Sequence, residues 1–281
     1  MKMKKLRSAC AVVAAMAVGA IINPGVASAA PGNAVIFGDS ISANPEVGPY
    51  LASHIATRSA ALTEFIRPNA AGCASDDLFR STYQDVSNRP TDSYSCAGAS
   101  LGSTGEHMRS LMDRASQNGH LNGATSEVVI QAGFNDALAV FLDINRNNAD
   151  MYATVREGME STIRRAKELA PNARIKVVGY TTMADPVTRE VCAVNVIPNL
   201  PGGRLPFAAI EDPIQQAMAD AAYAQQAMFV DNKPSTAQHN MCSNDRWLVG
   251  AVDTTTPDNF NLIVHMTNRG LRAVAANTAR A

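Results

Sequence analysis

The sequence has little charge of either sign. Its 281 residues contain 24 Lys and Arg against 25 Asp and Glu, which gives a formal net charge of −1. Proteins that neutralise phosphates concentrate Lys and Arg in runs or patches, and no such run occurs in this chain. Nucleic acid is therefore not an expected partner.

Long hydrophobic runs are also scarce, and the longest one lies at the start. Residues 1–29 have a cationic beginning, an apolar middle and a small-residue end, which is typical of a secretory signal. We expect cleavage after Ala29, within the sequence Ala27-Ser28-Ala29-Ala30, because cleavage after Ala30 would leave Pro31 first. The mature chain would then begin at Ala30, carry a net charge of about −5 because four Lys and Arg are lost, and be secreted, in the extracellular space or associated with the cell envelope.

A permanent membrane anchor is the alternative reading of this first segment. Its apolar part is short for a spanning helix, and Asn23-Pro24-Gly25 interrupts it. No second apolar run approaches the length needed to cross a bilayer. We therefore expect no stable membrane span once the signal is cleaved.

Cysteine is rare, with five in the chain and four after Ala30. An even number in an exported protein favours two disulfides, which four cysteines can form in three ways. The pairing Cys73–Cys96 and Cys192–Cys242 is favoured because it keeps both loops short. No Cys-x-x-Cys or zinc-type Cys/His spacing occurs, so we expect neither a metal nor another cofactor.

Internal repeats and linkers are absent as well, and the mature chain, 30–281, is expected to form one domain. Buried strands are predicted where short apolar runs end at turn residues, and helices where apolar residues recur every three or four positions. Strands that alternate with helices favour a parallel sheet covered on both faces. The predicted strands are 33–37, 126–131, 174–180 and 227–231, and the predicted helices are 149–169, 213–226 and 268–278.

Two regions do not follow this alternation and are predicted to be surface loops. Residues 87–95 are rich in Ser, Asn, Pro and Asp, and residues 184–206 contain four prolines and Gly202-Gly203. The second is long enough to shape a binding site.

Polar residues follow two of the predicted strands, where ligands of open α/β sheets usually bind. Ser40 follows the first strand and Asn135 follows the second. Ser40 could simply cap a helix and Asn135 could simply stabilise a turn. The G-x-S-x-G sequence of α/β-hydrolases does not fit, because Ser42 stands where its last glycine would be.

Four short blocks resemble, in the same order, the conserved blocks of the SGNH (GDSL) hydrolases. They are VIFGDSIS at 35–42, SCAGAS at 95–100, GFND at 133–136 and HMTNRG at 265–270. The resemblance is closest to the secreted, actinobacterial type of esterase and lipase. It implies a three-layer α/β/α sandwich with a central parallel sheet, of flavodoxin-like type.

The resemblance also assigns roles to individual residues. Ser40 would be the nucleophile and donate one backbone N–H to the oxyanion, Gly98 would donate a second backbone N–H, Asn135 its side-chain amide, and His265 would be the base. A serine hydroxyl needs such a base, and the developing oxyanion needs donors already in place. Asp39 and Asp136 are expected to be local hydrogen-bonding partners, and the remaining histidines are expected to have surface or packing roles: His54, His107, His120 and His239.

One position departs from the family pattern. SGNH enzymes usually carry an aspartate three residues before the histidine, and here that residue is Leu262. A main-chain carbonyl replaces the acid in some secreted members, so the Leu262 carbonyl is the favoured partner of His265. Asp258 is the alternative, and side-chain oxygens of Asn259 or Asn261 are further candidates.

The function expected from the resemblance is hydrolysis of carboxylic esters, with lipid-like acyl esters as the favoured substrates. The same residues could deacetylate a carbohydrate or transfer the acyl group to another alcohol at the cell envelope. A different class of function, an inactive SGNH-like binding module, would follow if the missing acid had abolished catalysis.

Overall fold

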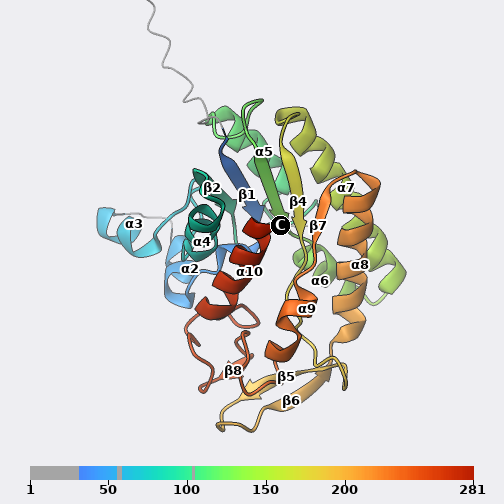
Figure 1. The fold of residues 1–281 in the computed structure, drawn as a ribbon. Helices are drawn as coiled ribbons and strands as arrows, with labels where there is room; N and C mark the ends of the chain where they lie inside the picture. The colour runs from blue at the N-terminus through green and yellow to red at the C-terminus, as the bar shows by residue number, and fades with distance from the viewer. Residues whose placement is uncertain (1–31, 56–58, 103–104) are drawn as a thin grey trace, which may run out of the picture.

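A sheet of five parallel strands forms the centre of the molecule in the computed structural model, which describes residues 32–55, 59–102 and 105–281 (Figure 1). The predicted signal, 1–29, lies outside these residues. The strand order is β2-β1-β3-β4-β7, so β2 lies on one side of β1 and the later strands lie on the other. The direction in which strands are added to the sheet therefore reverses between β1 and β3. In such sheets the ligand site lies beyond the carboxyl ends of the strands at this switch point. The strands are β1 (Ala34–Gly38), β2 (Thr91–Ser95), β3 (Glu127–Gln131), β4 (Arg174–Val178) and β7 (Met228–Val230).

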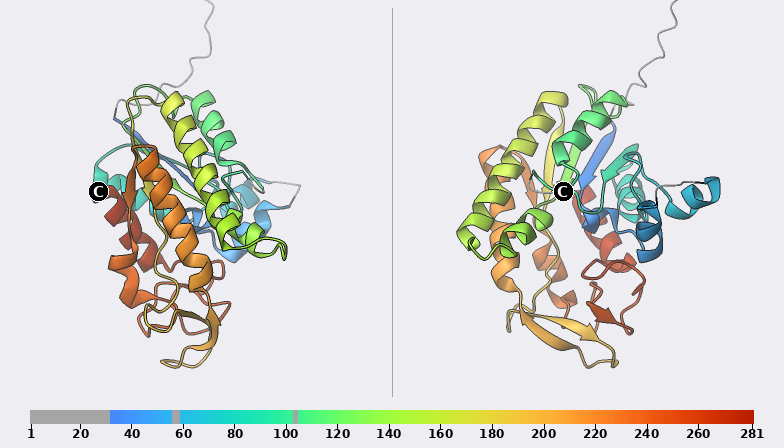
Figure 2. Two further views of the ribbon diagram at one scale, coloured as in Figure 1. Left: turned by 90° about the vertical axis from the view of Figure 1, so that its right-hand side faces the viewer. Right: turned by 180° about the vertical axis from the view of Figure 1, so that it is seen from behind.

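Helices cover both faces of the sheet, as the side view shows (Figure 2). One face packs against α4 (Leu78–Ser87) and α10 (Asn268–Arg280), and the other against α5 (Met108–Gln117), α7 (Asn148–Leu169) and α8 (Ala208–Ala224). The chain therefore has the predicted three-layer α/β/α architecture. The shorter helices are α1 (Ser40–Ala43), α2 (Val47–Ser53), α3 (Ala60–Ile66), α6 (Phe134–Phe141), α9 (Lys233–Thr236) and the 3-10 helix η1 (Ala237–His239).

The strand register brings the candidate site residues to one edge of the sheet. Gly38, the last residue of β1, is paired with Ser95 at the end of β2 and with Gln131 at the end of β3. All three strands thus end at the same level. The segments that begin at Asp39 and Cys96, and the turn before α6, leave the sheet side by side.

The region 87–95, predicted to be a loop, contains strand β2, so that prediction is wrong. β2 has the sequence TDSYS, which lacks the apolar alternation from which strands are recognised. It forms an edge of the sheet and is paired with β1 alone. Backbone pairing needs no apolar side chain, and most side chains of β2 are nevertheless buried.

The region 184–206 is also more regular than predicted. It contains β5 (Glu190–Asn195) and β6 (Gly202–Pro206), an antiparallel pair that β8 (Val252–Asp253) extends to a small second sheet. Pro198 and Pro201 lie in the connection between the two strands, where they do not interrupt the pairing. Helix α8 also begins earlier than predicted, at Ala208, and contains Pro213.

Both favoured disulfides are present. Cys73 and Cys96 have Cα atoms 5.3 Å apart, and Cys192 and Cys242 have Cα atoms 4.9 Å apart. The first bridge fixes the segment after β2, and the second joins β5 to the segment after η1. Among the helices in the described part of the chain, none is long and apolar enough to cross a membrane.

Candidate active site

Ser40 is the first residue of α1, immediately beyond the end of β1. The helix is capped by Asp39, whose Oδ1 accepts a hydrogen bond from the backbone N–H of Ile41 at 2.9 Å. Capping is therefore not the role of the Ser40 hydroxyl, and the Ser40 side chain remains partly exposed. The turn is tight, because a Cβ on Gly38 would lie 1.8 Å from the Ser42 hydroxyl.

The turn that carries Gly98 is joined to Asn135 through Ala99, the residue that follows Gly98. The Nδ2 group of Asn135 donates a hydrogen bond to the Ala99 carbonyl at 2.8 Å, which leaves its second N–H for another acceptor. Gly98 adopts φ +81, a conformation that favours glycine. In the described part of the chain, no atom beyond Gly98 and its two neighbours lies within 4 Å of the position that a Cβ on Gly98 would occupy. The Cys73–Cys96 bridge anchors this turn to the segment before α4.

His265 is oriented by a main-chain carbonyl, but not by the predicted one. Its Nδ1 lies 2.8 Å from the carbonyl oxygen of Ile263. The carbonyl of Leu262 instead accepts the backbone N–H of His265 at 3.2 Å. The prediction of Leu262 is thus wrong by one residue, because this backbone bond already uses the Leu262 oxygen and the turn presents the next carbonyl to the ring.

The other candidates for the missing acid are not the partner of His265 Nδ1, which is the Ile263 carbonyl, and among the described residues the Asn261 Oδ1 has no hydrogen-bond partner. The Asp258 carboxylate accepts the backbone N–H of Asn268 at the start of α10, at 2.9 Å. The amide of Asn261 donates to the Met266 carbonyl, and that of Asn259 donates to the Asp253 carbonyl.

The turn before His265 requires an uncommon backbone conformation. Val264 has φ +63, which is strained for a β-branched residue. Two backbone hydrogen bonds to Val249 hold this turn, from Val264 N–H to the Val249 carbonyl at 2.9 Å and from Val249 N–H to the His265 carbonyl at 2.8 Å. Strain of this kind persists only where surrounding contacts fix the conformation, and it is concentrated at functional sites.

These contacts determine the state of the imidazole. A carbonyl can only accept, so Nδ1 carries the proton and Nε2 of the neutral ring is an acceptor. Burial lowers the pKa of His265 to about 4, although the Ile263 carbonyl opposes this shift. Nε2 is buried and, among the residues that the structure describes, has no hydrogen-bond partner. A buried acceptor left unpaired is unusual, and here it is the atom that a general base would use.

The turns that carry Ser40, Gly98 and Asn135 lie at one edge of the sheet, and the segment that leads to His265 packs against the same region. The segment before His265 packs beside the segment after Ser40, through the bridge between Glu46 and Asn261. Val47 N–H also donates to the Phe260 carbonyl at 3.0 Å. No hydrogen bond joins His265 Nε2 to Ser40.

Tyr180, predicted to be the last residue of a strand, also reaches this edge. It lies two residues beyond β4, and its hydroxyl donates to Asp39 Oδ2 at 2.5 Å and accepts from Phe134 N–H at 3.0 Å. Burial raises the pKa of the Asp39 carboxyl to about 7, while the Tyr180 hydrogen bond opposes that rise. Asp136 Oδ2 accepts the backbone N–H of Leu101 at 2.9 Å. Ser40 and Asn135 each follow a predicted strand, whereas the predicted strand 174–180 includes Tyr180 and so hides its position beyond the strand end.

The other histidines make contacts away from these turns. Nδ1 of His54 lies 2.9 Å from the Tyr50 carbonyl, Nδ1 of His120 lies 2.9 Å from the Tyr94 hydroxyl, and His239 stacks on Trp247. His107 precedes α5 as its N-cap residue. Within the described ranges, no group of three or more His, Cys, Asp or Glu side chains is arranged to hold a metal ion.

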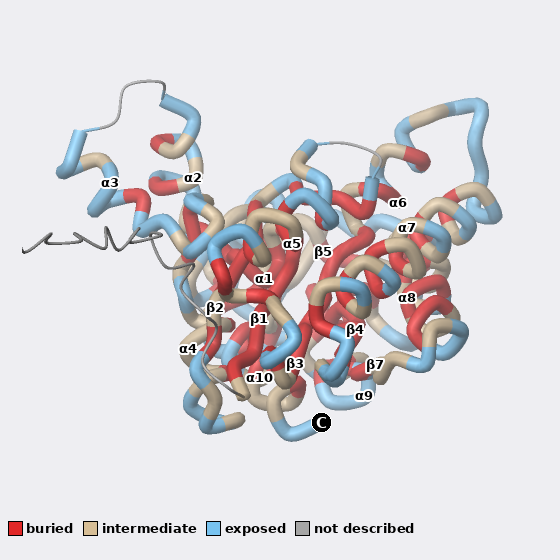
Figure 3. Tube along the Cα trace, turned by 90° about the horizontal axis from the view of Figure 1, so that it is seen from above, coloured by how far each residue is buried: buried red, intermediate tan, exposed pale blue. Residues whose placement is uncertain are grey.

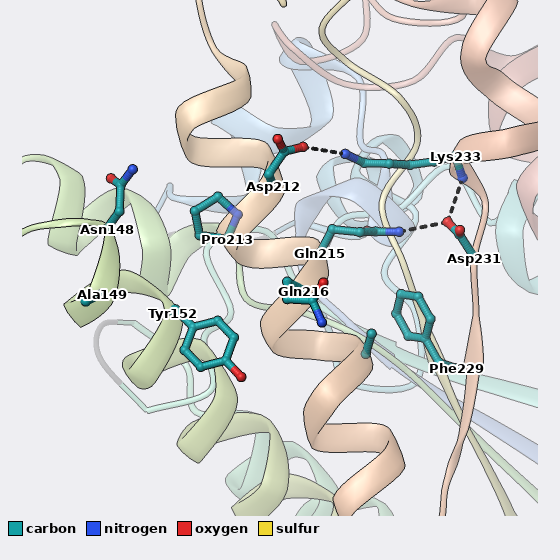
Figure 4. A pocket seen from close by; sticks show the side chains of 11 residues that line it. Asn148, Ala149, Tyr152, Asp212, Pro213, Gln215, Gln216, Phe229, Asp231 and Lys233 are labelled. Carbon is teal, nitrogen blue, oxygen red and sulfur yellow. Dashed lines mark hydrogen bonds and ion pairs between the residues drawn. The ribbon is translucent and has the colours of Figure 1, made fainter. Parts of the chain in front are cut away.

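A cavity of about 730 Å³ between α7, α8 and β7 is separate from these residues (Figure 4). In it, Gln215 donates to Asp231 at 2.9 Å and Lys233 bonds Asp212 at 3.1 Å. Its eleven lining residues include no serine, cysteine or histidine, and therefore no pair of a nucleophile and an imidazole base.

Comparison with known proteins identifies the family and agrees with the fold. Residues 36–273 match the model of the GDSL-like Lipase/Acylhydrolase family. A search of curated proteins finds no match. Among solved structures, the fold is similar to phospholipase A1 from Streptomyces albidoflavus NA297, with a TM-score of 0.54 and 20% identity over 86% of this chain and 95% of that one. It is also similar to an extracellular lipase from Streptomyces rimosus, with a TM-score of 0.57 and 18% identity over 85% and 94%. A carbohydrate esterase family 2 enzyme from Corynascus has a TM-score of 0.50 and 16% identity over 90% and 66%.

Proposed function

Because the chain belongs to the GDSL-like lipase/acylhydrolase family and is therefore a carboxylic ester hydrolase, we propose that Ser40 and His265 form its catalytic pair. The observation that carries this proposal is the state of His265. Its Nδ1–H is held by the Ile263 carbonyl, its pKa is lowered by burial, and its Nε2 has no hydrogen-bond partner within the described ranges. Such a ring is neutral at pH 7 and has its basic nitrogen available.

The proposed reaction passes through an acyl-enzyme. Ser40 Oγ attacks the ester carbonyl while His265 Nε2 takes its proton, and the same nitrogen then protonates the leaving alcohol. The carbonyl oxygen becomes an oxyanion and accepts from the N–H of Ser40, the N–H of Gly98 and the Asn135 amide. Water, deprotonated by His265, then attacks the acyl carbon; the bond from that carbon to Ser40 Oγ breaks, the carboxylic acid leaves, and His265 returns the proton to Ser40 Oγ.

The Ile263 carbonyl would replace the usual acid. It fixes the tautomer as a carboxylate does, but it supplies a dipole in place of a full negative charge when the imidazolium forms. The low pKa of His265 fits this weaker partner. The base is therefore weaker but is neutral over a wide pH range.

We further propose that the substrates are lipid-like acyl esters. Helix α6 carries Asn135 in its first turn and ends at Phe141, which is 55% exposed. The segment that follows also exposes apolar side chains, with Leu142 at 73% and Ile144 at 96%. On the histidine side, Ile263 is 57% exposed. Figure 3 shows that the turn after α6 and the pair α2 and α3 extend toward the same side of the molecule. Exposed apolar side chains around a site favour an apolar ligand.

Export is part of the proposal. Two disulfides are typical of proteins that fold in an oxidising compartment. Residues 1–29 would be removed as a signal, and residues 30–281 would act as one SGNH hydrolase domain outside the cell.

The proposal is tested by assaying the mature protein and Ser40→Ala on p-nitrophenyl esters from acetyl to palmitoyl. We expect turnover that is lost in the variant and that rises beyond acetyl. Highest turnover on acetyl esters would contradict the lipid-like preference and favour carbohydrate deacetylation. A folded wild-type protein without turnover on any ester would contradict the proposed catalytic pair and favour the binding module.

A further inference from the structure

The phenol of Tyr180 lies between the turn that carries Ser40 and the turn that carries Asn135. Tyr180 is 2% exposed, and its hydroxyl makes two hydrogen bonds. It donates to Asp39 Oδ2 at 2.5 Å and accepts from Phe134 N–H at 3.0 Å. Asp39 and Phe134 are the immediate neighbours of Ser40 and Asn135. One oxygen atom therefore links the two turns.

Each of these hydrogen bonds fixes the end of a helix. Asp39 uses Oδ1 to cap α1 at Ile41 N–H and uses Oδ2 to accept from Tyr180. Phe134 is the first residue of α6, where a helix leaves its backbone N–H without a partner in the helix. The Tyr180 oxygen supplies that partner. These hydrogen bonds thereby fix the direction of α6, and with it the position of the Asn135 amide, relative to the start of α1.

Tyr180 is itself held by the sheet. Gly179 N–H donates to the Val230 carbonyl of β7 at 2.9 Å, and the Asn232 amide donates to the Gly179 carbonyl at 3.1 Å. The ring of Tyr180 packs edge-on against that of Phe134, with centroids 6.2 Å apart. Tyr180 lies two residues beyond β4, and the hydrogen bonds of Gly179 hold it close to the end of the sheet.

We propose that Tyr180 is a positioning residue of the ester hydrolase, one that holds the Asn135 amide in line with the oxygen of Ser40. This inference rests on the proposed roles of Ser40 and Asn135. An oxyanion donor acts only if it is in place before the charge develops, and a displacement of about 1 Å can cost roughly a hundredfold in rate. Tyr180 does not touch the substrate, so its removal affects kcat much more than KM.

The test is Tyr180→Phe, which keeps the ring and removes the oxygen. Tyr152→Phe is the matched control, because the Tyr152 hydroxyl also donates to a carboxylate, that of Asp220 at 2.6 Å, but this bond joins α7 to α8 and does not involve the turns that carry Ser40 and Asn135. Both changes are made with Asn135 intact and with Asn135→Ala. Rates on p-nitrophenyl butyrate are divided by the number of sites that a fluorophosphonate titrates, so that unfolded protein does not contribute.

We expect Tyr180→Phe to lower kcat by at least about tenfold, with KM changed less than about twofold, while Tyr152→Phe retains wild-type kcat. In the Asn135→Ala background, Tyr180→Phe should lower kcat by less than about twofold, because the amide that it positions is gone. If Tyr180→Phe gives no titratable sites, Asp39→Asn replaces it, because Asp39 accepts the Tyr180 hydrogen bond. It is measured with and without Asn135→Ala, and the same result is expected.

Three results would overturn the inference. Wild-type kcat in Tyr180→Phe would show that the two hydrogen bonds do not matter for turnover. Equal losses in both backgrounds would show that Tyr180 stabilises the fold without acting through Asn135. A wild-type kcat in Asn135→Ala would show that Asn135 is not an oxyanion donor, which contradicts the proposed function. If Asn135→Ala lowers kcat and Tyr180→Phe has the same effect in both backgrounds, only the inference about Tyr180 is wrong.

Discussion

At the scale of single residues, the absence of an acid three positions before His265 is compensated by geometry. The Ile263 carbonyl reaches Nδ1 at 2.8 Å because Val264 adopts φ +63, and Val249 pairs with both Val264 and His265. The sequence predicts that a carbonyl replaces the acid. It cannot identify which carbonyl, because that depends on one backbone dihedral of a residue that rarely adopts it.

Asp258→Asn distinguishes this arrangement from an ordinary triad. The Asp258 carboxylate accepts the N–H of Asn268, and an asparagine oxygen can still do so. We expect kcat on p-nitrophenyl acetate to fall less than about threefold. Loss of the acid of a Ser-His-Asp triad costs about 10⁴-fold, so a fall of that size would identify Asp258 as the orienting group.

The acid limb of the pH profile reports on the same histidine. The base acts when neutral, and burial lowers the pKa of His265 from 6.5 to about 4. We therefore expect kcat/KM to be constant from pH 7 to about 5 and to decline only as pH approaches 4. Asp39→Asn and Asp76→Asn are the controls, because burial raises the pKa of both carboxyls to about 7. An acid limb near pH 6.5 that persists in both variants would contradict the assignment.

At the scale of elements, the turn after β2 is held by a covalent bond as well as by the sheet. Cys96 N–H donates to the Gly38 carbonyl at 2.9 Å, and Cys96 is bonded to Cys73. Gly98 lies two residues further on. The second bridge, Cys192–Cys242, holds the β5 strand of the small second sheet. The two disulfides should therefore have the same effect on stability and different effects on catalysis.

This difference is measured with the double variants Cys73→Ser/Cys96→Ser and Cys192→Ser/Cys242→Ser. Each should lower the free energy of unfolding by about 3 to 4 kcal/mol, because each loses a loop constraint in the unfolded chain. Rates are measured at a temperature where both remain folded. Only the first variant should lose kcat, since Gly98 is then free to move. Equal kcat in the two variants would contradict a role for the bridge in placing Gly98.

At the scale of the whole molecule, a buried charge network fastens the C-terminal helix to the sheet. Lys176 of β4 is fully buried, and its Nζ lies 3.4 Å from Glu127 of β3 and donates to Tyr83 of α4 and to the Thr278 carbonyl of α10. Helix α10 follows the histidine directly. Helix α10 is therefore held to the core by this network and also follows the turn that carries His265.

Lys176→Met should lower the free energy of unfolding by about 3 kcal/mol, because a buried carboxylate loses a partner. Arg174→Met is the control, since Arg174 also contacts Glu127, at 2.9 Å, but its side chain is 51% exposed. An exposed pair contributes less than about 1 kcal/mol. Urea denaturation measures both, and equal losses would contradict a special role for the buried amine.

The sequence predicts the fold better where side chains carry the signal. The apolar strands β1, β3, β4 and β7 and the amphipathic α7 are read from periodicity. Strand β2 is missed because its pairing is a backbone property and its side chains are polar. The β5–β6 pair is missed because its connection contains Pro198 and Pro201 and because β6 itself begins with Gly202-Gly203, residues that are typical of loops. Tyr180 and Ile263 are missed because their roles depend on which turns the register brings together.

The central claim is that Ser40 is a nucleophile activated by His265. The most direct measurement is mass spectrometry of peptides after labelling with a fluorophosphonate, in the wild type, Ser40→Ala and His265→Ala. The account predicts one adduct, on the peptide that contains Ser40, absent in Ser40→Ala and formed at least about a hundredfold more slowly in His265→Ala. An adduct on any other serine, or labelling of Ser40 at the same rate without His265, would contradict it.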